Sequence, residues 1–97
     1  MIDPLRGTLV DHSGVTADAV DHEVVPTKSN RNYLLIQNNH DTLDFWINFG
    51  VAAQASQPSV RVQAGDWLIF GDGRGFVTTQ SIHLIGQAGA TYTIKEG

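Results

Sequence analysis

Hydrophobic residues in this chain fall in short runs that alternate with polar residues, as they do in β-strands. The clearest run is LDFWINFG at 43–50, in which large apolar side chains occupy every second position. An earlier run, YLLIQN at 33–38, is apolar on both faces, which is typical of a central strand covered on both sides. The polar segment NHDT at 39–42 has the composition of a tight turn, so the two runs are predicted to form a hairpin.

Further runs in the second half of the chain predict strands bounded by Gly, Asn, Asp or Pro. These runs are VRV at 60–62, WLIF at 67–70, SIHLIG at 81–86 and TYTIKE at 91–96. Gly65 and Asp66 interrupt the alternation between the first two runs, as a turn or a β-bulge would. TYTIKE is predicted to lie at the edge of a sheet, because a strand at the end of the chain is easily placed there.

Strands of this length, with turn signals every ~8–12 residues, predict an all-β fold. We expect a single small β-sandwich or β-barrel of about eight short antiparallel strands. Val, Ile and Thr account for 24 of the 97 residues, and Lys and Glu together for only four, so the exposed face of a helix has few suitable residues. The predicted core consists of Leu34, Ile36, Phe45, Ile47, Phe49, Val60, Val62, Leu84, Tyr92 and Ile94.

The N-terminal part of the chain shows no sustained period of either kind. Residues 1–15 are predicted to form a flexible arm that orders on a partner, and residues 16–97 to form the β-sandwich domain. Within the arm, Ser13 and Gly14 would also suit the tight turn of a minor hairpin.

The composition narrows the classes of partner. Six Lys and Arg residues against ten Asp and Glu residues give a net charge of −4, which argues against nucleic acid, because nucleic-acid binding needs a basic face. No apolar run approaches the ~20 residues that cross a bilayer, and MIDPLRGTLV lacks the apolar stretch of a signal peptide, so we expect no membrane partner. The absence of cysteine excludes disulfides, thiolate metal sites and cysteine nucleophiles.

None of the motifs that carry catalysis or cofactor binding is recognisable. The four histidines show neither HxH nor HExxH spacing, and we predict solvated loop residues, with a shared metal site on an oligomer axis as the alternative. GDGRG at 71–75 does not follow the phosphate-loop pattern and is predicted to be a mobile loop. We therefore expect no enzyme activity, no catalytic residues, no cofactor and no metal ion.

Four residues are candidates for an interface with other molecules: Trp46, Arg31, Tyr33 and Arg61. Trp46 lies on the polar face of its run, where it either contacts a neighbouring subunit or packs in a second layer. Arg31 and Arg61 are expected to be exposed, with contacts to another subunit or to main-chain carbonyls as the alternative. Trp67, after the predicted bulge, is expected in the core.

Five segments carry a resemblance to a known family: NRNYLLIQN, FWINFGVAA, QPSVRVQAGDW, GFVTTQSIHLIG and TYTIKEG. The chain resembles small virion-associated proteins of tailed bacteriophages, whose members carry an N-R-x-x-L-x-I-Q-N strand, a W-I-N-F-G strand, a P-S-I-x-L-x-A-G segment and a final I-I-G…T-x-K-E-G. The resemblance extends from Thr16 to Gly97. The chain departs from the family pattern at Asp44 and Phe45, before Trp46, and in the GDGRG loop.

The resemblance implies a structural protein of the phage particle, because the shared motifs are structural rather than catalytic. It implies a capsid decoration protein, made in the host cytoplasm and placed on the capsid surface, where it binds the major capsid protein and stabilises the head shell. A homotrimer docked through the N-terminal arm would match the threefold positions of such a shell. The alternative is a head-fibre or tail component that binds a host-surface glycan through Trp46 or Tyr33.

Overall fold

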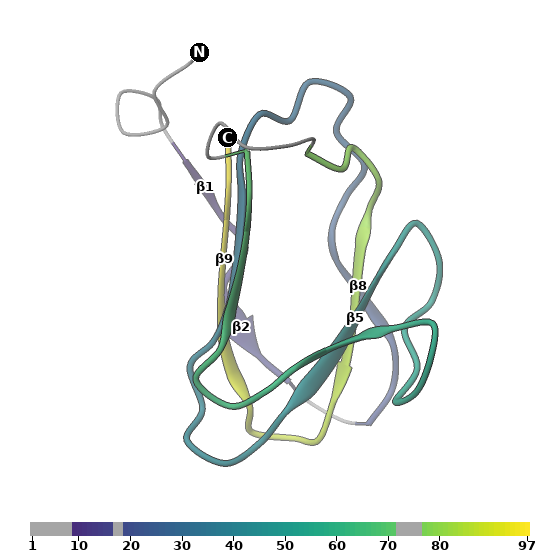
Figure 1. Cartoon of the computed structure of the whole chain (residues 1–97), viewed down its shortest axis with the longest axis vertical. Coiled ribbons are helices and arrows are strands. Elements are labelled where there is room, and N and C mark those ends of the chain that lie inside the picture. Colours follow the sequence, from purple (N-terminus) through teal and green to yellow (C-terminus); the bar gives the residue numbers. More distant parts are fainter. Residues whose placement is uncertain (1–8, 17–18, 72–76) are drawn as a thin grey trace.

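The described part of the chain is built of β-strands packed in two layers. The computed structural model describes residues 9–16, 19–71 and 77–97. The strands are β1 (Val10–Asp11), β2 (Gly14–Val15), β3 (His22–Val25), β4 (Leu34–Asn38), β5 (Phe45–Phe49), β6 (Val60–Val62), β7 (Trp67–Phe70), β8 (Ile82–Gly86) and β9 (Thr91–Glu96). They form two antiparallel sheets (Figure 1), which confirms the all-β class and identifies the fold as a sandwich rather than a barrel.

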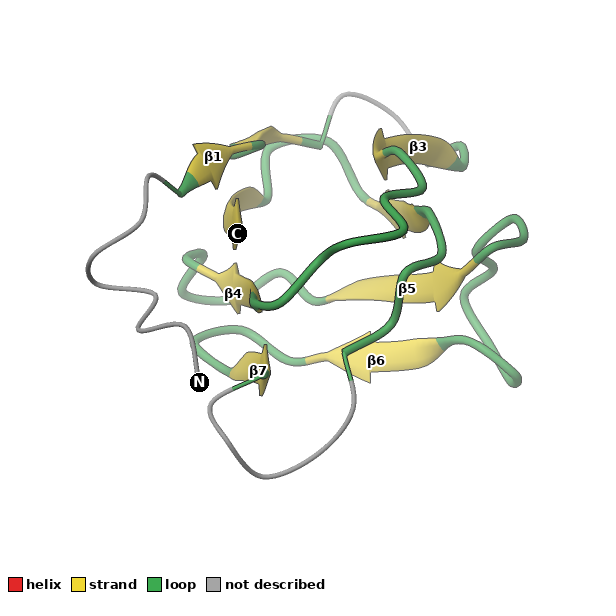
Figure 2. Ribbon diagram, turned by 90° about the horizontal axis from the view of Figure 1, so that it is seen from above, coloured by secondary structure: helices red, strands yellow, loops and turns green. Residues whose placement is uncertain are grey.

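The order of the strands is that of a jelly roll. The first sheet runs β1–β9–β4–β7, with β2 also paired to β9, and the second runs β3–β8–β5–β6. Figure 2 shows the two sheets as separate stacks, one containing β1, β4 and β7 and the other β3, β5 and β6. From β2 onward, every connection between described strands passes from one sheet to the other, except the hairpin that joins β5 to β6.

The predicted hairpin between 33–38 and 43–50 is wrong, because β4 belongs to the first sheet and β5 to the second. The buried side chain of Asn38 explains the crossing. Its Nδ2 donates to the carbonyls of Leu43 and Val62, at 2.8 and 3.0 Å, and its Oδ1 accepts from the N–H of His40 at 3.0 Å. These bonds satisfy the connection internally and direct β5 onto the opposite sheet instead of back along β4.

Asn38 also fixes the crossing from β6 to β7. Its N–H donates to the carbonyl of Asp66 at 2.9 Å, and its carbonyl accepts from the N–H of Gly65 at 3.1 Å. Gly65 has a φ of +81°, a conformation that glycine adopts without steric cost. The turn expected at Gly65 and Asp66 is therefore confirmed. The side chain and the main chain of one buried residue, Asn38, hold both crossings in place.

The core lies between the two sheets. Its fully buried residues include Val25, Leu34, Ile36, Phe45, Ile47, Val62, Ile82, Leu84 and Ile94, and the half-buried Phe49 and Tyr92 pack against them. Edge-to-face ring pairs join the sheets, with 6.0 Å between the centroids of Phe45 and Tyr92 and 6.0 Å between those of Phe49 and Phe70. Most of the predicted core is thus observed.

Two apolar residues expected in the core lie outside it. Val60 is 41% exposed on β6, and Trp67 is 59% exposed on β7. Val60 belongs to the edge strand β6, where only one neighbouring strand covers it, whereas Trp67 lies on the outward-facing side of β7. The alternation of Val60 and Val62 holds, but only Val62 is far enough inside to be covered.

The strand β9 is an interior strand, which corrects its predicted place at a sheet edge. β1 and β2 pair with it in one continuous register, from Val10 opposite Glu96 to Val15 opposite Thr91, so they act as a single interrupted edge strand. Residues 10–15 therefore belong to the first sheet, and neither a minor hairpin nor an arm extending to residue 15 is observed. Residues 1–8 of the predicted arm, and 72–75 of the predicted GDGRG loop, lie outside the described residues.

Arg31 is buried, so the expectation that it is exposed is wrong. Its side chain is 0% exposed and that of Glu96 is 4% exposed, and the Arg31 Nε donates to Glu96 Oε1 at 2.9 Å. The remaining guanidinium donors reach the main-chain carbonyls of Thr78 at 2.8 Å, Gln80 at 2.9 Å and Pro26 at 2.8 Å. Arg31 therefore connects β9 of the first sheet to the segments beside β3 and β8 of the second.

His12 joins this cluster from its half-buried side, since its Nε2 lies 2.5 Å from Glu96 Oε2. Burial raises the pKa of the Glu96 carboxyl. The hydrogen bonds from Arg31 and His12, together with their charges, lower it by more than burial raises it, so the pKa of Glu96 is below its ordinary value. A carboxyl whose pKa is depressed by folding stabilises the folded state above its unfolded pKa. That stabilisation is lost as the pH falls through the folded pKa.

Acid is therefore expected to remove the contribution of the Glu96 carboxylate to the free energy of unfolding. Urea unfolding at about pH 6 and about pH 3 measures this free energy, and the difference between the wild type and Glu96→Gln is expected to be smaller at the lower pH. Glu23→Gln, on the exposed side chain of β3, is the control and is expected to follow the wild type at both values. A gap of equal size at both pH values would contradict this account of the cluster.

Candidate functional site

The outer face of the second sheet carries a groove beside Trp46. The alternation of β5 buries Phe45 and Ile47 in the core and turns Trp46 to the outside, as the sequence predicts. Trp46 lies directly opposite Arg61 of β6 and Ile85 of β8, so these three side chains form one row across the sheet. Residues that are distant in sequence are thus brought together on one surface.

Arg61 covers part of the Trp46 ring, with its guanidinium carbon 5.9 Å from the ring centroid. Asp44 holds the guanidinium in place, since its Oδ2 accepts from Arg61 Nε at 2.9 Å and from Nη2 at 2.5 Å. Its other oxygen accepts from the N–H of Ala64 at 2.8 Å. These hydrogen bonds, that from the Arg61 side chain first, lower the pKa of the Asp44 carboxyl, so it stays ionised at neutral pH.

The groove has a volume of about 610 Å³, within the ~300–1,000 Å³ that is usual for ligand sites. Its lining residues are Ala19, Thr42, Leu43, Asp44, Trp46, Ala55, Arg61, Ile85, Gly86 and Gln87. The lining combines an aromatic ring and apolar residues with a guanidinium, a carboxylate, a hydroxyl and an amide. This set suits the recognition of a sugar ring or of a protein side chain.

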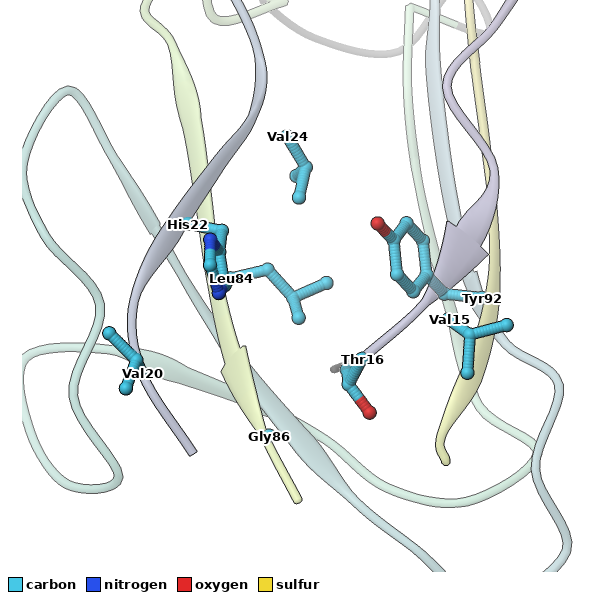
Figure 3. A pocket seen from close by; sticks show the side chains of 8 residues that line it. All are labelled: Val15, Thr16, Val20, His22, Val24, Leu84, Gly86 and Tyr92. Carbon is cyan, nitrogen blue, oxygen red and sulfur yellow. The ribbon is translucent and has the colours of Figure 1, made fainter. Parts of the chain in front are cut away.

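A second, smaller cavity lies between the sheets, beside β2 and β3 (Figure 3). Figure 3 shows the Tyr92 hydroxyl and the Leu84 side chain pointing into this space from opposite sheets. Burial raises the pKa of the Tyr92 hydroxyl, which keeps it protonated. The cavity measures about 200 Å³, below the ~300 Å³ at which ligand pockets begin, so the groove beside Trp46 is the better candidate site.

The structure brings two of the four predicted interface residues together. Trp46 and Arg61 line one groove, and Arg61 is exposed as expected, with 52% of its side chain accessible. Tyr33 is half-buried beside β4 in the first sheet, where its N–H and carbonyl both bond to Gly97 at 3.0 Å. Arg31 lies in the core, and its guanidinium donates to main-chain carbonyls of the same chain. The sequence predicted contacts of this kind as the alternative to exposure.

Sequence reasoning missed Asp44 as a partner of Arg61 and missed the outward side of β7. Asp44 follows the polar segment 39–42 in the sequence, and in the structure its carboxylate reaches across to Arg61 of β6. The strand β7 exposes Trp67 and Ile69, at 59% and 42%, on the outer face of the first sheet. The uncharged sequence WLIF could have indicated an exposed apolar strand. Its place at the edge of a sheet, however, depends on how the strands are arranged in space and cannot be predicted from the local sequence.

The histidines are not free loop residues. His83 Nδ1 lies 3.1 Å from Asp21 Oδ2, His40 Nδ1 accepts from the N–H groups of Thr42 and Leu43 at 3.0 and 2.9 Å, and His12 binds Glu96. Across 9–16, 19–71 and 77–97, no group of three or more potential metal ligands is found. Nor does an apolar helix of membrane-spanning length occur in those ranges.

Comparison of the chain with protein-family models, with curated proteins and with solved structures finds no match.

Proposed function

We propose that this chain is a structural component of a tailed-phage particle, most specifically a decoration protein on the outside of the capsid. The observation that supports it best is the jelly-roll strand order, which recurs in viral capsid domains and in lectins. A fold alone is compatible with many functions, so the proposal joins this topology to the phage-protein resemblance of Thr16 to Gly97. The protein would be made in the host cytoplasm and would act by binding rather than by catalysis.

The chemistry of the outer surfaces supports a binding role. Asp44 and Arg61 in the groove are engaged with each other, and they flank a half-buried tryptophan, an arrangement suited to recognising a partner. A decoration protein that spans the joint between two copies of the major capsid protein stabilises the shell by mass action, because it binds only the assembled state. Copies of this chain would associate with one another on the shell, where a homotrimer is the expectation from its threefold positions.

Purified particles provide the test. We expect the protein at a copy number proportional to that of the major capsid protein, and an electron-microscopy map is expected to place it on the outer surface of the head. Particles that lack it are expected to lose their genome at lower temperature than complete particles. A copy number of about a dozen or fewer, with density at the portal or the tail, would contradict the decoration role.

The docking role expected for the N-terminal arm needs a shorter deletion than one of residues 1–15. Such a deletion would also remove β1 and β2, which cover one side of β9. Removal of residues 1–8 leaves this edge intact and is expected to weaken binding to undecorated particles. Undiminished binding would exclude the arm and move the docking surface to the sheets.

A second candidate function is recognition of a host-surface glycan by a head fibre or tail component. The groove beside Trp46 favours it, because sugars stack on aromatic rings and bond to carboxylate, amide and guanidinium groups. Under this alternative, Trp46→Ala removes adsorption to host cells, whereas under the decoration proposal adsorption is unchanged.

A further inference from the structure

The two sheets end at four edges, and natural proteins protect such edges from pairing with other chains by charge, proline, bulges or short strands. Three edges show these devices. β1 and β2 have two residues each and carry Asp11; β3 carries Glu23, a register shift and Pro26 directly after it; and β6 has three residues with Arg61 at its centre. The fourth edge, β7, is the sequence WLIF and has no charge, proline or register shift within the strand.

The strand β7 presents apolar side chains at this unprotected edge. Trp67 and Ile69 are 59% and 42% exposed, while Leu68 and Phe70 pack towards the core. Within the described chain, β7 pairs only with β4. Exposed apolar edge strands of this kind are a template for pairing with another strand.

The backbone of the same two residues faces the open edge. Gln37 of β4 pairs with Trp67 of β7, and the next residues along, Asn38 and Asp66, also lie opposite each other. The N–H of Asn38 donates to the carbonyl of Asp66, so Asn38 and Asp66 form a hydrogen-bonded pair. In an antiparallel ladder, hydrogen-bonded and non-hydrogen-bonded pairs alternate. The pairs formed by Trp67 and Ile69 with β4 are therefore of the second kind, so their N–H and C=O groups point away from β4.

We propose that β7 binds β7 of a second copy of this chain, antiparallel and across a two-fold axis at Leu68. In this register, Trp67 of each copy lies opposite Ile69 of the other, which is an aromatic pair with a β-branched residue. The edge-facing N–H and C=O groups of both residues then exchange hydrogen bonds, and the two first sheets become one continuous sheet.

The symmetry of the strand identifies a second copy as the occupant, because the edge-facing groups of Trp67 and Ile69 meet their own equivalents about a two-fold axis at Leu68. The net charge of −4 opposes self-association in general, but the four residues of β7 carry no charge, so two copies approach each other at least cost there. The antiparallel two-fold register also sets the two copies of Asp66, the residue directly before β7, at opposite ends of the contact. This geometry favours a pair of copies over the trimer expected from shell symmetry, because an edge-to-edge contact of this kind is closed by two.

Light scattering on the purified protein tests the contact without any phage component, so the result does not depend on the proposed virion role. The wild type is expected to have twice the mass of the chain, and Trp67→Lys and Ile69→Lys are expected to halve that mass while keeping the wild-type circular dichroism. Val51→Lys is the matched control, since Val51 is also 59% exposed but lies in the loop between β5 and β6, and its mass is expected to stay at that of the dimer.

Hydrogen exchange locates the contact within the dimer. The Trp67 amide is expected to exchange faster by about tenfold or more in Ile69→Lys than in the wild type, and the Ile69 amide likewise in Trp67→Lys. A wild-type monomer at millimolar concentration, a trimer, or a dimer that survives Ile69→Lys would each overturn the proposal.

Discussion

Replacing Arg31 by Ala is expected to lower the free energy of unfolding by about 3–5 kcal/mol. The variant leaves the carboxylate of Glu96 buried without its main partner and removes the donors that satisfy the carbonyls of Pro26, Thr78 and Gln80. A loss of this size is a large part of the ~5–15 kcal/mol that stabilises a typical domain. Urea unfolding at neutral pH measures it, and Arg31→Lys, which keeps the charge with fewer donors, is expected to fall between the wild type and Arg31→Ala.

Arg61 provides the matched control for Arg31. It also binds a carboxylate, that of Asp44, but its side chain is 52% exposed and water replaces its contacts. Arg61→Ala is therefore expected to cost no more than about 1 kcal/mol. If Arg31→Ala and Arg61→Ala lowered the free energy of unfolding equally, the burial of Arg31 would not explain how much it stabilises the fold.

Ile47→Ala is expected to cost about 2–5 kcal/mol, because the variant loses buried apolar surface and leaves a cavity between the sheets. Ile47 is 0% exposed at the centre of β5, with strands on both sides. Thermal or urea unfolding measures the loss. Val60→Ala is the control, since Val60 lies opposite Ile47 on the edge strand β6 but is 41% exposed, and its effect is expected to stay within about 0.5 kcal/mol. A larger loss for Val60→Ala than for Ile47→Ala would reverse the assignment of the core.

Local alternation predicted the strands and most of the core because it depends only on neighbouring residues. Phe45 and Ile47 face inward and Trp46 outward in any sheet that buries one face of β5. The same reasoning cannot tell which strands are neighbours. The short connection at 39–42 is compatible with a hairpin or with a crossing, and the bonds of Asn38 to Leu43 and Val62 decide between them.

The candidate site was predictable to the extent that it depends on the face of a strand. Trp46 and Arg61 each alternate outward, so both were candidates, but their contact across β5 and β6 follows from the register of the sheet. Arg31 was misjudged because a charged residue is usually exposed, and its burial depends on Glu96, 65 positions further along the chain. Trp67 was misjudged because both faces of WLIF are apolar, so alternation does not show which face turns to the core, and in the structure Leu68 and Phe70 do so.

The pairing of the first and last strands also bears on how fast the chain folds. His12 and Glu96 are 84 positions apart, and nearly every strand pair in the two sheets joins distant parts of the chain. Domains dominated by such distant pairings fold in milliseconds to seconds rather than microseconds, because long loops must close before the distant contacts form. The first sheet cannot be completed until β9 has been synthesised, however early residues 10–15 leave the ribosome.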